Sequence, residues 1–127
     1  MEFIVIDDDR TVQMLSKAII LRVATGANVV PFLDPYDGLE YINKELSTTT
    51  RKCIVLLDIN MPGMNGWELL QKINSDVLAK QHYIYIYSSS IDQKDKQRAD
   101  EHAGVAGFIE KPLTLDKVQL LLQTAAQ

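Results

Sequence analysis

Three consecutive acids, Asp7, Asp8 and Asp9, follow an apolar run that extends from Phe3 to Ile6. Carboxylates so close together repel one another, so the arrangement is costly unless they diverge into water, one of them is protonated or a cation binds between them. A hard divalent ion such as Mg2+ prefers oxygen ligands and often partners phosphate oxygens. The acids are therefore a candidate Mg2+ site.

Polar residues with complementary chemistry follow three later apolar runs. Asp58 ends the run IVLLD, Ser88 ends YIYIYS, and Lys111 comes shortly after GFI. Phosphoryl transfer to a carboxylate requires mainly that the reactants are positioned and that charge on the phosphoryl oxygens is neutralised. A metal ion, an ammonium and a hydroxyl therefore suffice, and no histidine base is required. An aspartyl phosphate is a mixed anhydride that hydrolyses in water, which suits a signal that must decay.

Short apolar, β-prone runs and segments with helical spacing alternate along the chain. The apolar runs are Phe3–Ile6, Val29–Leu33, Cys53–Leu57, Tyr83–Tyr87 and Gly107–Ile109. Helices are predicted from about Arg10 with Gly26 just beyond the end, after Pro35, from about Asn65, from about Asp92 to His102, and after Pro112. In the first of these helices, the spacing places Val12, Leu15 and Ile19 on the apolar face.

This alternation predicts an α/β fold, a doubly wound parallel sheet with helices on both faces, because parallel neighbours need crossover connections. In such a sheet, ligands bind outside the carboxyl ends of the strands, near the point where the strand order reverses. The residues that follow the predicted strands are Asp7, Asp8, Asp58, Ser88 and Lys111. The sequence thus predicts one cleft that holds three carboxylates, a hydroxyl and an ammonium.

Length and composition favour a single domain over residues 1–127. The chain is 46% hydrophobic and 24% charged, and its net charge of -4 argues against a nucleic-acid or anionic-membrane partner. Every long apolar stretch is broken well before the roughly 20 residues of a membrane span, so a cytoplasmic location is expected. Cys53 is the only cysteine, cannot form an internal disulfide, and is expected to be buried.

The order and spacing of these residues resemble those of the response-regulator receiver domains of two-component signalling. The motifs that carry the resemblance are DD at Asp7, LLDINMPGMNGWE from Leu56 to Glu68, IYSSS around Ser88, and EKP from Glu110. Together they span nearly the whole chain in the order that the family has. The resemblance implies a flavodoxin-like (βα)5 fold with strand order 2-1-3-4-5.

The resemblance also implies a role for each residue of the cleft. Asp58 would be the phosphoacceptor, while Ser88 and Lys111 would contact phosphoryl oxygens. The implied Mg2+ ligands are Asp8, Asp58 and the backbone carbonyl of Asn60, with Asp7 binding through water. Phe108 is at the position of the family's rotameric switch, where it lacks a hydroxyl, and the Lys111–Pro112 bond would be cis.

The function that follows from the resemblance is signalling rather than enzymatic turnover. A histidine kinase or histidine phosphotransfer protein would supply the phosphoryl group, and phosphorylation would shift an equilibrium between inactive and active forms. Movement of Ser88 and Phe108 would change the surface formed by the fourth predicted helix, the fifth strand and the fifth predicted helix, where a protein target would dock. The chain is expected to be a stand-alone receiver; the alternative is a domain cut from a hybrid kinase or larger regulator.

The identity of the hydroxyl that contacts the phosphoryl group has an alternative. The chain carries one more residue between the hydroxyl and Lys111 than the family's commonest spacing, which makes Ser89 an alternative to Ser88. The distance from Asp58 favours Ser88. Asn60 and Ser90 are at positions that tune dephosphorylation in the family.

Two rival functions fit parts of the sequence. Asp7, Asp9 and Thr11 fit the D-x-D-x-T motif of haloacid-dehalogenase-type phosphatases, with Asp7 as nucleophile and Asp9 as acid/base. That interpretation leaves Asp58 and the PGMNG segment unexplained, and only Asp116 follows the lysine where that family has an acidic pair. The second rival is a pseudo-receiver that keeps the fold without taking phosphate, and the intact set of site residues argues against it.

Other conspicuous residues are predicted to be structural. Asp9 is a predicted N-cap of the first helix, and Trp67 is predicted to pack within a helix interface. The tyrosines of YIYIYS alternate along a strand, so they are expected to pack on one sheet face. His82 and His102 are predicted to be solvated and outside the cleft.

Overall fold

The computed structural model describes residues 1–80, 82–89 and 92–126. Ser90, which the sequence linked to dephosphorylation, lies outside these residues. The strands are β1 (Glu2–Ile6), β2 (Asn28–Phe32), β3 (Cys53–Leu57), β4 (Tyr83–Ser88) and β5 (Gly107–Glu110). The helices are α1 (Arg10–Val23), α2 (Pro35–Glu45), α3 (Gly66–Lys72), α4 (Ser75–Leu78), α5 (Gln93–Glu101) and α6 (Leu115–Ala125).

All strands of the sheet run parallel, in the order β2-β1-β3-β4-β5, which confirms the predicted doubly wound topology. The register pairs Ile6 with Leu57 and Ser88 with Glu110. Asp7 and Asp58 therefore leave the sheet side by side, where the order of the strands reverses. The fold places the predicted site residues at one edge of the sheet.

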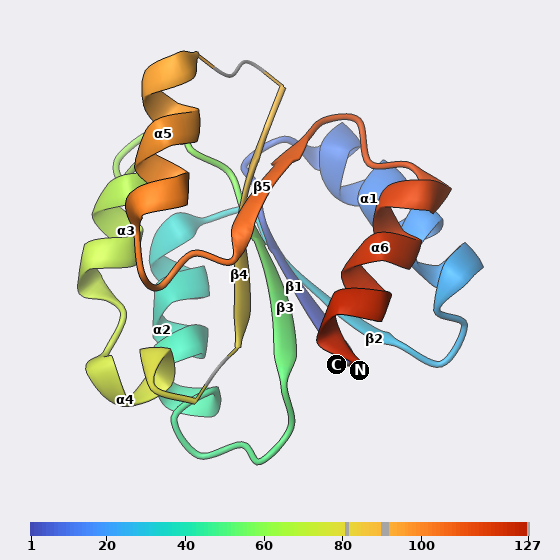
Figure 1. Ribbon diagram of the computed structural model, residues 1–127, viewed down its shortest axis with the longest axis horizontal. Coiled ribbons are helices and arrows are strands. Elements are labelled where there is room, and N and C mark those ends of the chain that lie inside the picture. The colour runs from blue at the N-terminus through green and yellow to red at the C-terminus, as the bar shows by residue number, and fades with distance from the viewer. Residues whose placement is uncertain (81, 90–91, 127) are drawn as a thin grey trace.

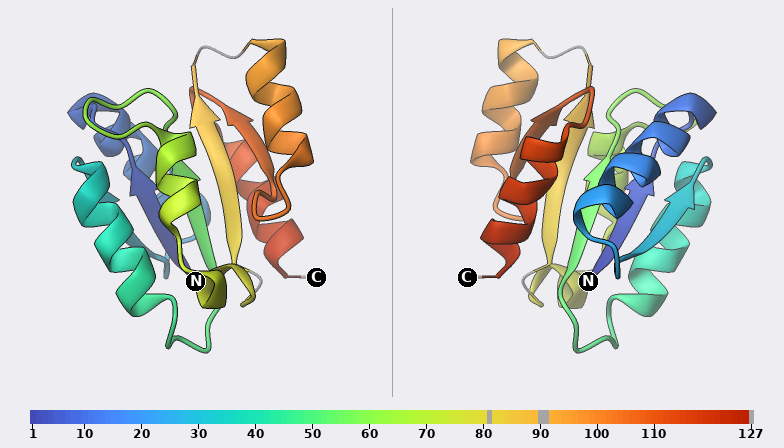
Figure 2. Two further views of the ribbon diagram at one scale, coloured as in Figure 1. Left: turned by 90° about the vertical axis from the view of Figure 1, so that its left-hand side faces the viewer. Right: turned by 90° about the vertical axis from the view of Figure 1, so that its right-hand side faces the viewer.

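Helices cover both faces of this sheet, as Figures 1 and 2 show. One face packs against α2, α3, α4 and α5, and its core includes Ile4 and Ile6 of β1. The other face packs against α1 and α6, and its core includes Phe3 and Val5. Successive strand residues point to opposite faces, so a strand covered on both sides must be apolar throughout. Every residue of β3 is buried for this reason.

Local sequence signals start the helices that flank the site. The Asp9 side chain caps α1 by accepting hydrogen bonds from the backbone N–H groups of Thr11, at 2.8 Å, and Val12, at 3.2 Å. This confirms the predicted N-cap. At the start of α3, Asn65 and Glu68 form a reciprocal capping box. The cap fixes the end of the loop that leads from the third strand.

Gly66 allows the loop after β3 to fold back onto its own beginning. A Cβ atom at this position would lie 2.5 Å from the carbonyl oxygen of Asp58, closer than real contacts allow. The Gly66 N–H donates to the Ile59 carbonyl at 2.8 Å. The backbone around Asp58 is therefore held against the start of α3, and a side chain at Gly66 would displace it.

Most predicted elements are present, with limited differences. The fourth and fifth predicted helices are α5 and α6, because the single turn α4 was not predicted. Four residues are too few to show a helical period. Ser88 is the last residue of β4 rather than the first residue after it. The Lys111–Pro112 bond is cis, as the resemblance implied.

The predicted apolar face of α1 is confirmed for Val12 and Ile19, which are partly buried against the core, and was wrong for Leu15. The buried residues of α1 are Gln13, Ser16 and Ile20, whereas Leu15 is 56% exposed. Two polar side chains occupy the buried stripe because their hydrogen-bond partners lie in the sheet below them.

The structural predictions for the aromatic residues are confirmed, but the prediction for His82 was wrong. Trp67 is 6% exposed within the core, and Tyr85 and Tyr87 are buried on the face covered by α1 and α6. His82 is partly buried rather than solvated. Its Nδ1 accepts from the Cys53 N–H at 3.1 Å, and its Nε2 lies 3.3 Å from the Leu46 carbonyl oxygen.

Candidate functional site

Three carboxylates converge at the carboxyl ends of β1 and β3. Asp7, Asp8 and Asp58 each offer an oxygen, and these atoms lie within 4.8 Å of one another. Asp7 is completely buried and Asp58 is 6% exposed, while Asp8 is exposed to solvent. Two of the three charges thus lie in a region where water screens them poorly. The predicted cluster is present, with one side open to solvent.

Lys111 supplies the positive charge that pairs with these acids. Its ammonium contacts Oδ2 of Asp7 and lies 3.7 Å from Oδ1 of Asp58. The Lys111 side chain is 13% exposed, so this interaction is largely shielded from solvent. One ammonium faces three carboxylates, and the cluster keeps an excess of negative charge. A further cation would relieve that excess.

The excess of negative charge affects the pKa of Asp58. Burial, followed by the charge of Asp7, raises its pKa from 3.8 to about 6. Lys111 and the Asn60 N–H, which lies 3.3 Å from Asp58 Oδ1, oppose the increase. The carboxylate is therefore ionised near neutral pH against an unfavourable environment, and it is a group that a bound cation would stabilise.

The donor set fits Mg2+ and not a soft metal, because the side-chain ligands that converge here among the described residues are carboxylate oxygens. The two oxygens of Asp7 are already engaged: Oδ1 accepts from the Asp9 N–H at 2.9 Å and Oδ2 contacts Lys111. Asp8 has an exposed side chain, and Asp58 has a weaker contact to Lys111. The oxygens of Asp8 and Asp58 are therefore less engaged by neighbouring groups than those of Asp7.

Ser88 and Lys111 lie on neighbouring strand ends. Ser88 is 2% exposed, and its carbonyl accepts from the Lys111 N–H at 2.9 Å. Pairing of Leu57 with Ile86 places Ser88 just beyond the position opposite Asp58. Ser89, the alternative hydroxyl, is exposed and lies outside the strand. The geometry supports Ser88 over Ser89.

The remaining predicted site residues are peripheral to the acids. Asn60 is exposed in the loop after β3. Phe108 is partly buried on β5 and pairs with Ile86 of β4. Its side chain packs against the core between the sheet and helices α2 to α5. A cavity of about 200 Å3 next to Phe108 is lined by Asp92, Gln93, Lys96 and Glu110. Phe108 therefore belongs to the predicted output surface, on the face of β5 that α5 covers.

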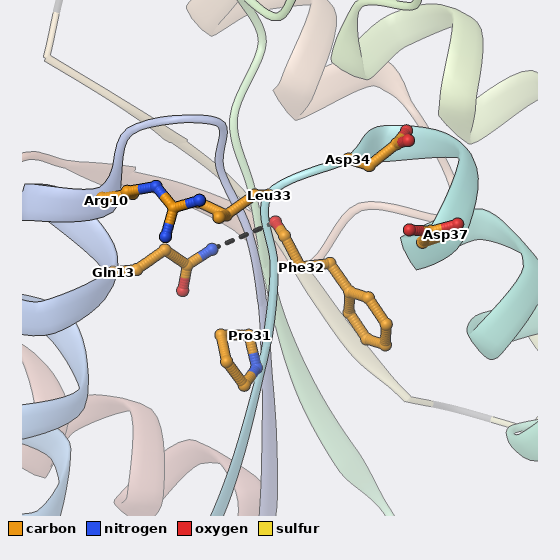
Figure 3. A pocket seen from close by; sticks show the side chains of 7 residues that line it. All are labelled: Arg10, Gln13, Pro31, Phe32, Leu33, Asp34 and Asp37. Atoms are coloured by element: carbon orange, nitrogen blue, oxygen red, sulfur yellow. Dashed lines mark hydrogen bonds between the residues drawn. The ribbon is translucent and has the colours of Figure 1, made fainter.

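Sequence reasoning missed Gln13, which supports the acids from α1. Its Nε2 lies within hydrogen-bond distance of the carbonyl oxygens of Val5, at 2.9 Å, and of Asp7 and Phe32, both at 3.1 Å. Figure 3 shows the bond to Phe32 at the wall of a cavity of about 440 Å3. The side chain is 8% exposed. One signal in the sequence could have indicated this role. Gln13 lies one helical turn from Ser16 and two from Ile20, on the same face of α1, and a polar residue buried on that face needs hydrogen-bond partners.

Comparison with known proteins gives a consistent family. The family model described as "Response regulator receiver domain" matches residues 3–123. The chemotaxis protein CheY1 of Helicobacter pylori is 28% identical over 98% of both chains. The two-component response regulator ARR16 of Arabidopsis thaliana is 29% identical, over 90% of this chain and 71% of that protein. The cyclic di-GMP phosphodiesterase response regulator RpfG of Xanthomonas campestris is 27% identical, but the match covers only 28% of its length.

Solved structures agree with the family match. A two-component response regulator from Cytophaga hutchinsonii has a TM-score of 0.85 and 29% identity, over 98% of this chain and 96% of that one. A response regulator receiver protein from Dyadobacter fermentans has the same TM-score at 21% identity, over 99% and 98% of the chains, which supports the fold alone. With the family match extending over almost all of its residues, the chain belongs to the response regulator receiver domain family.

Proposed function

We propose that Asp58 is the phosphoacceptor of this receiver and that the reaction depends on Mg2+. The observation that carries the proposal is the convergence of Asp7, Asp8 and Asp58 within 4.8 Å, with Lys111 contacting two of them. Asp58 differs from Asp7 in that its oxygens are not tied to a short lysine contact. A metal ion held here would supply charge neutralisation for the phosphoryl group.

Each neighbouring residue has a distinct part in this proposal. Asp58 presents a buried carboxylate oxygen to the phosphorus atom of the donor, and the leaving group departs with its bonding electron pair. Asp8, Asp58 and the Asn60 carbonyl would hold the metal ion, with Asp7 reaching it through water. Ser88 donates a hydrogen bond to one phosphoryl oxygen, and Lys111 pairs with another.

Phosphorylation then alters the surface formed by α5, β5 and α6. Movement of the Ser88 hydroxyl toward the phosphoryl group leaves room on the α5 side of β5, and Phe108 turns inward to fill it. The surface so remodelled is where a target protein docks. Upstream, a histidine kinase or histidine phosphotransfer protein supplies the phosphoryl group. The receiver acts as a phosphorylated signal and catalyses only its own phosphorylation and dephosphorylation.

Residues 1–127 form one receiver domain in this proposal, with a cytoplasmic place of action. Among residues 1–80, 82–89 and 92–126, the structure has no helix whose length and apolarity would let it cross a membrane. The net charge of -4 supports protein partners over nucleic acid or anionic membranes. The phosphodiesterase activity in the name of RpfG belongs to a protein of which this chain matches 28%, so it is not proposed here.

The test is incubation with Mg2+ and acetyl phosphate, followed by intact-mass measurement. The expected result is gain of one phosphoryl group, abolished by chelation of Mg2+ and by Asp58→Asn. Asp100→Asn, which alters an exposed acid on α5, is the matched control and should be phosphorylated like the wild type.

Two other outcomes would replace the proposal. Failure of the wild type to gain a phosphoryl group, with retained fold, would favour a pseudo-receiver. Turnover of phosphate esters that persists in Asp58→Asn and disappears in Asp7→Asn would favour the phosphatase interpretation, in which Asp7 is the nucleophile.

A further inference from the structure

Tyr87 is a large polar side chain beside the acids to which the proposed chemistry gives no role. It is 1% exposed and directly precedes Ser88 on β4. Its side chain lies on the sheet face covered by α1 and α6. The Lys111 ammonium lies 5.1 Å from the centroid of the Tyr87 ring, within the range of a cation–π interaction.

The Tyr87 hydroxyl is held in place from α1. It shares a hydrogen bond of 2.8 Å with the hydroxyl of Ser16, which is itself 1% exposed. A buried phenol needs such a partner, and a buried serine needs one too. The pair therefore fixes the orientation of the ring next to Lys111.

The orientation of the Tyr87 ring matters because a groove lies beside Lys111. The groove has a volume of about 480 Å3 and is lined by Asp9, Val12, Leu15, Ser16, Ile19, Tyr87, Ser89, Lys111, Pro112 and Leu113. Lysine carries its charge on a flexible four-carbon stem. The Lys111 stem thus has open space on one side and the acids on the other. The contacts to Asp7 and Asp58 draw the ammonium toward the acids, and the Tyr87 ring adds an attraction where the groove meets them.

We propose that Tyr87, oriented by Ser16, is a positioning residue that, together with the acids, holds the Lys111 ammonium at the reaction centre. The inference rests on the proposed function, because it assigns Lys111 to a phosphoryl oxygen. The Lys111 side chain is 13% exposed, so the ring attracts it in a largely desolvated setting. Loss of the ring should weaken binding of a phosphoryl group roughly three- to thirty-fold, the range expected for cation–π pairs.

The first experiment locates the ammonium in the free protein by NMR. An aromatic ring shifts the resonances of protons above its face upfield, so the Lys111 Cε protons should be upfield of those of exposed lysines. Tyr87→Phe keeps the ring and should keep the shift, while Tyr87→Leu should abolish it. Absence of the shift in the wild type would overturn the proposal. Amide spectra confirm that each variant is folded.

The second experiment measures the effect on the site with beryllofluoride and saturating Mg2+, a phosphoryl mimic, by calorimetry. Tyr87→Leu should weaken binding several-fold, and Tyr87→Phe by less than about threefold, because only the ring contacts the cation. In a Lys111→Met background, Tyr87→Leu should cause no further loss. Ser16→Ala should match Tyr87→Phe, since both remove the same hydrogen bond.

The results separate this inference from the proposed function. Equal losses from Tyr87→Leu with and without Lys111 would mean that Tyr87 acts through packing alone, and would overturn the inference. Equal affinities of the Tyr87→Leu and wild-type proteins would overturn it as well. A wild type that neither binds beryllofluoride nor takes phosphate would contradict the proposed function, while the Lys111 resonances would still decide where the ammonium lies.

Discussion

The two ends of the sheet both bury titratable side chains, but the carboxyl end buries charged groups and the amino end buries uncharged ones. At the carboxyl end, Asp7 and Asp58 are buried together and share Lys111. At the amino end, the buried and half-buried groups have uncharged forms that pair with their neighbours. The Tyr41 hydroxyl donates to Glu2 Oε1 at 2.8 Å, and His82 lies between the Cys53 N–H and the Leu46 carbonyl.

The pKa shifts show what this difference means. Burial raises the pKa of Cys53 to about 11 and that of Tyr41 to about 12, and it lowers the pKa of His82. All three groups are therefore neutral at pH 7 to 8, in agreement with their hydrogen bonds. The pKa of Asp58 is raised only to about 6, so it is charged in that range. The amino end is a satisfied structural network, whereas the carboxyl end stores an electrostatic cost that a cation can relieve.

The largest expected effect is a gain in stability when Asp58 is made neutral. Asp58→Asn should raise the free energy of unfolding by about 2–3 kcal/mol at pH 8 without Mg2+, from a shift of roughly two pKa units. An acid with a raised folded-state pKa contributes stability below its unfolded value near 3.8 and loses it as pH rises through about 6. The difference between variant and wild type should therefore appear between pH 4 and 6. Urea denaturation across this range measures it.

Mg2+ provides the matched control for this first prediction. The ion should stabilise the wild type with the logarithm of its concentration above the dissociation constant, and it should stabilise Asp58→Asn much less, because a ligand is lost. A variant that is less stable than the wild type at pH 8 without Mg2+ would contradict the idea that unrelieved charge is stored at the carboxyl end.

The next effect, of opposite sign, comes from His82 at the amino end. His82→Leu should lower the free energy of unfolding by about 1–2 kcal/mol, because the Cys53 N–H loses its acceptor. His82→Asn, which retains an acceptor and a donor, should restore part of the loss. Since the pKa of His82 is lowered, its stabilisation is present above pH 6.5 and is lost as pH falls through the folded-state pKa. The gap between wild type and His82→Leu should narrow in acid; a constant gap would mean that packing, and not the hydrogen bonds, carries the effect.

The same comparison explains what the sequence could and could not predict. The acids of the carboxyl end were predictable because each follows a recognisable strand, and parallel topology brings strand ends together. Asp9 was predictable as a cap because its partners are two and three residues away. His82 was not, because its partners lie on β3 and at the end of α2, and only the folded chain brings them near.

The prediction of the buried residues on α1 failed for the same reason. Helical periodicity chose Leu15 because it is apolar, but it is 56% exposed while Gln13 and Ser16 are buried. A periodic pattern predicts burial from hydrophobicity and takes no account of backbone carbonyls at strand ends that a side chain can reach. Gln13 is buried because the carbonyls of Val5, Asp7 and Phe32 accept from its amide.

The smallest expected effect tests whether the hydrogen bonds at the amino end are separable contacts. Tyr41→Phe keeps the ring pair with Phe32, whose centroids are 5.1 Å apart, and removes only the hydrogen bond to Glu2. It should cost about 1 kcal/mol, and Glu2→Gln should cost less because an amide oxygen still accepts. Combined with His82→Leu, the two losses should add, since the residues share no hydrogen-bond partner. Urea denaturation of the double variant decides the point. A combined loss well above the sum would mean that the amino end is one cooperative unit, whose failure at one contact weakens the other.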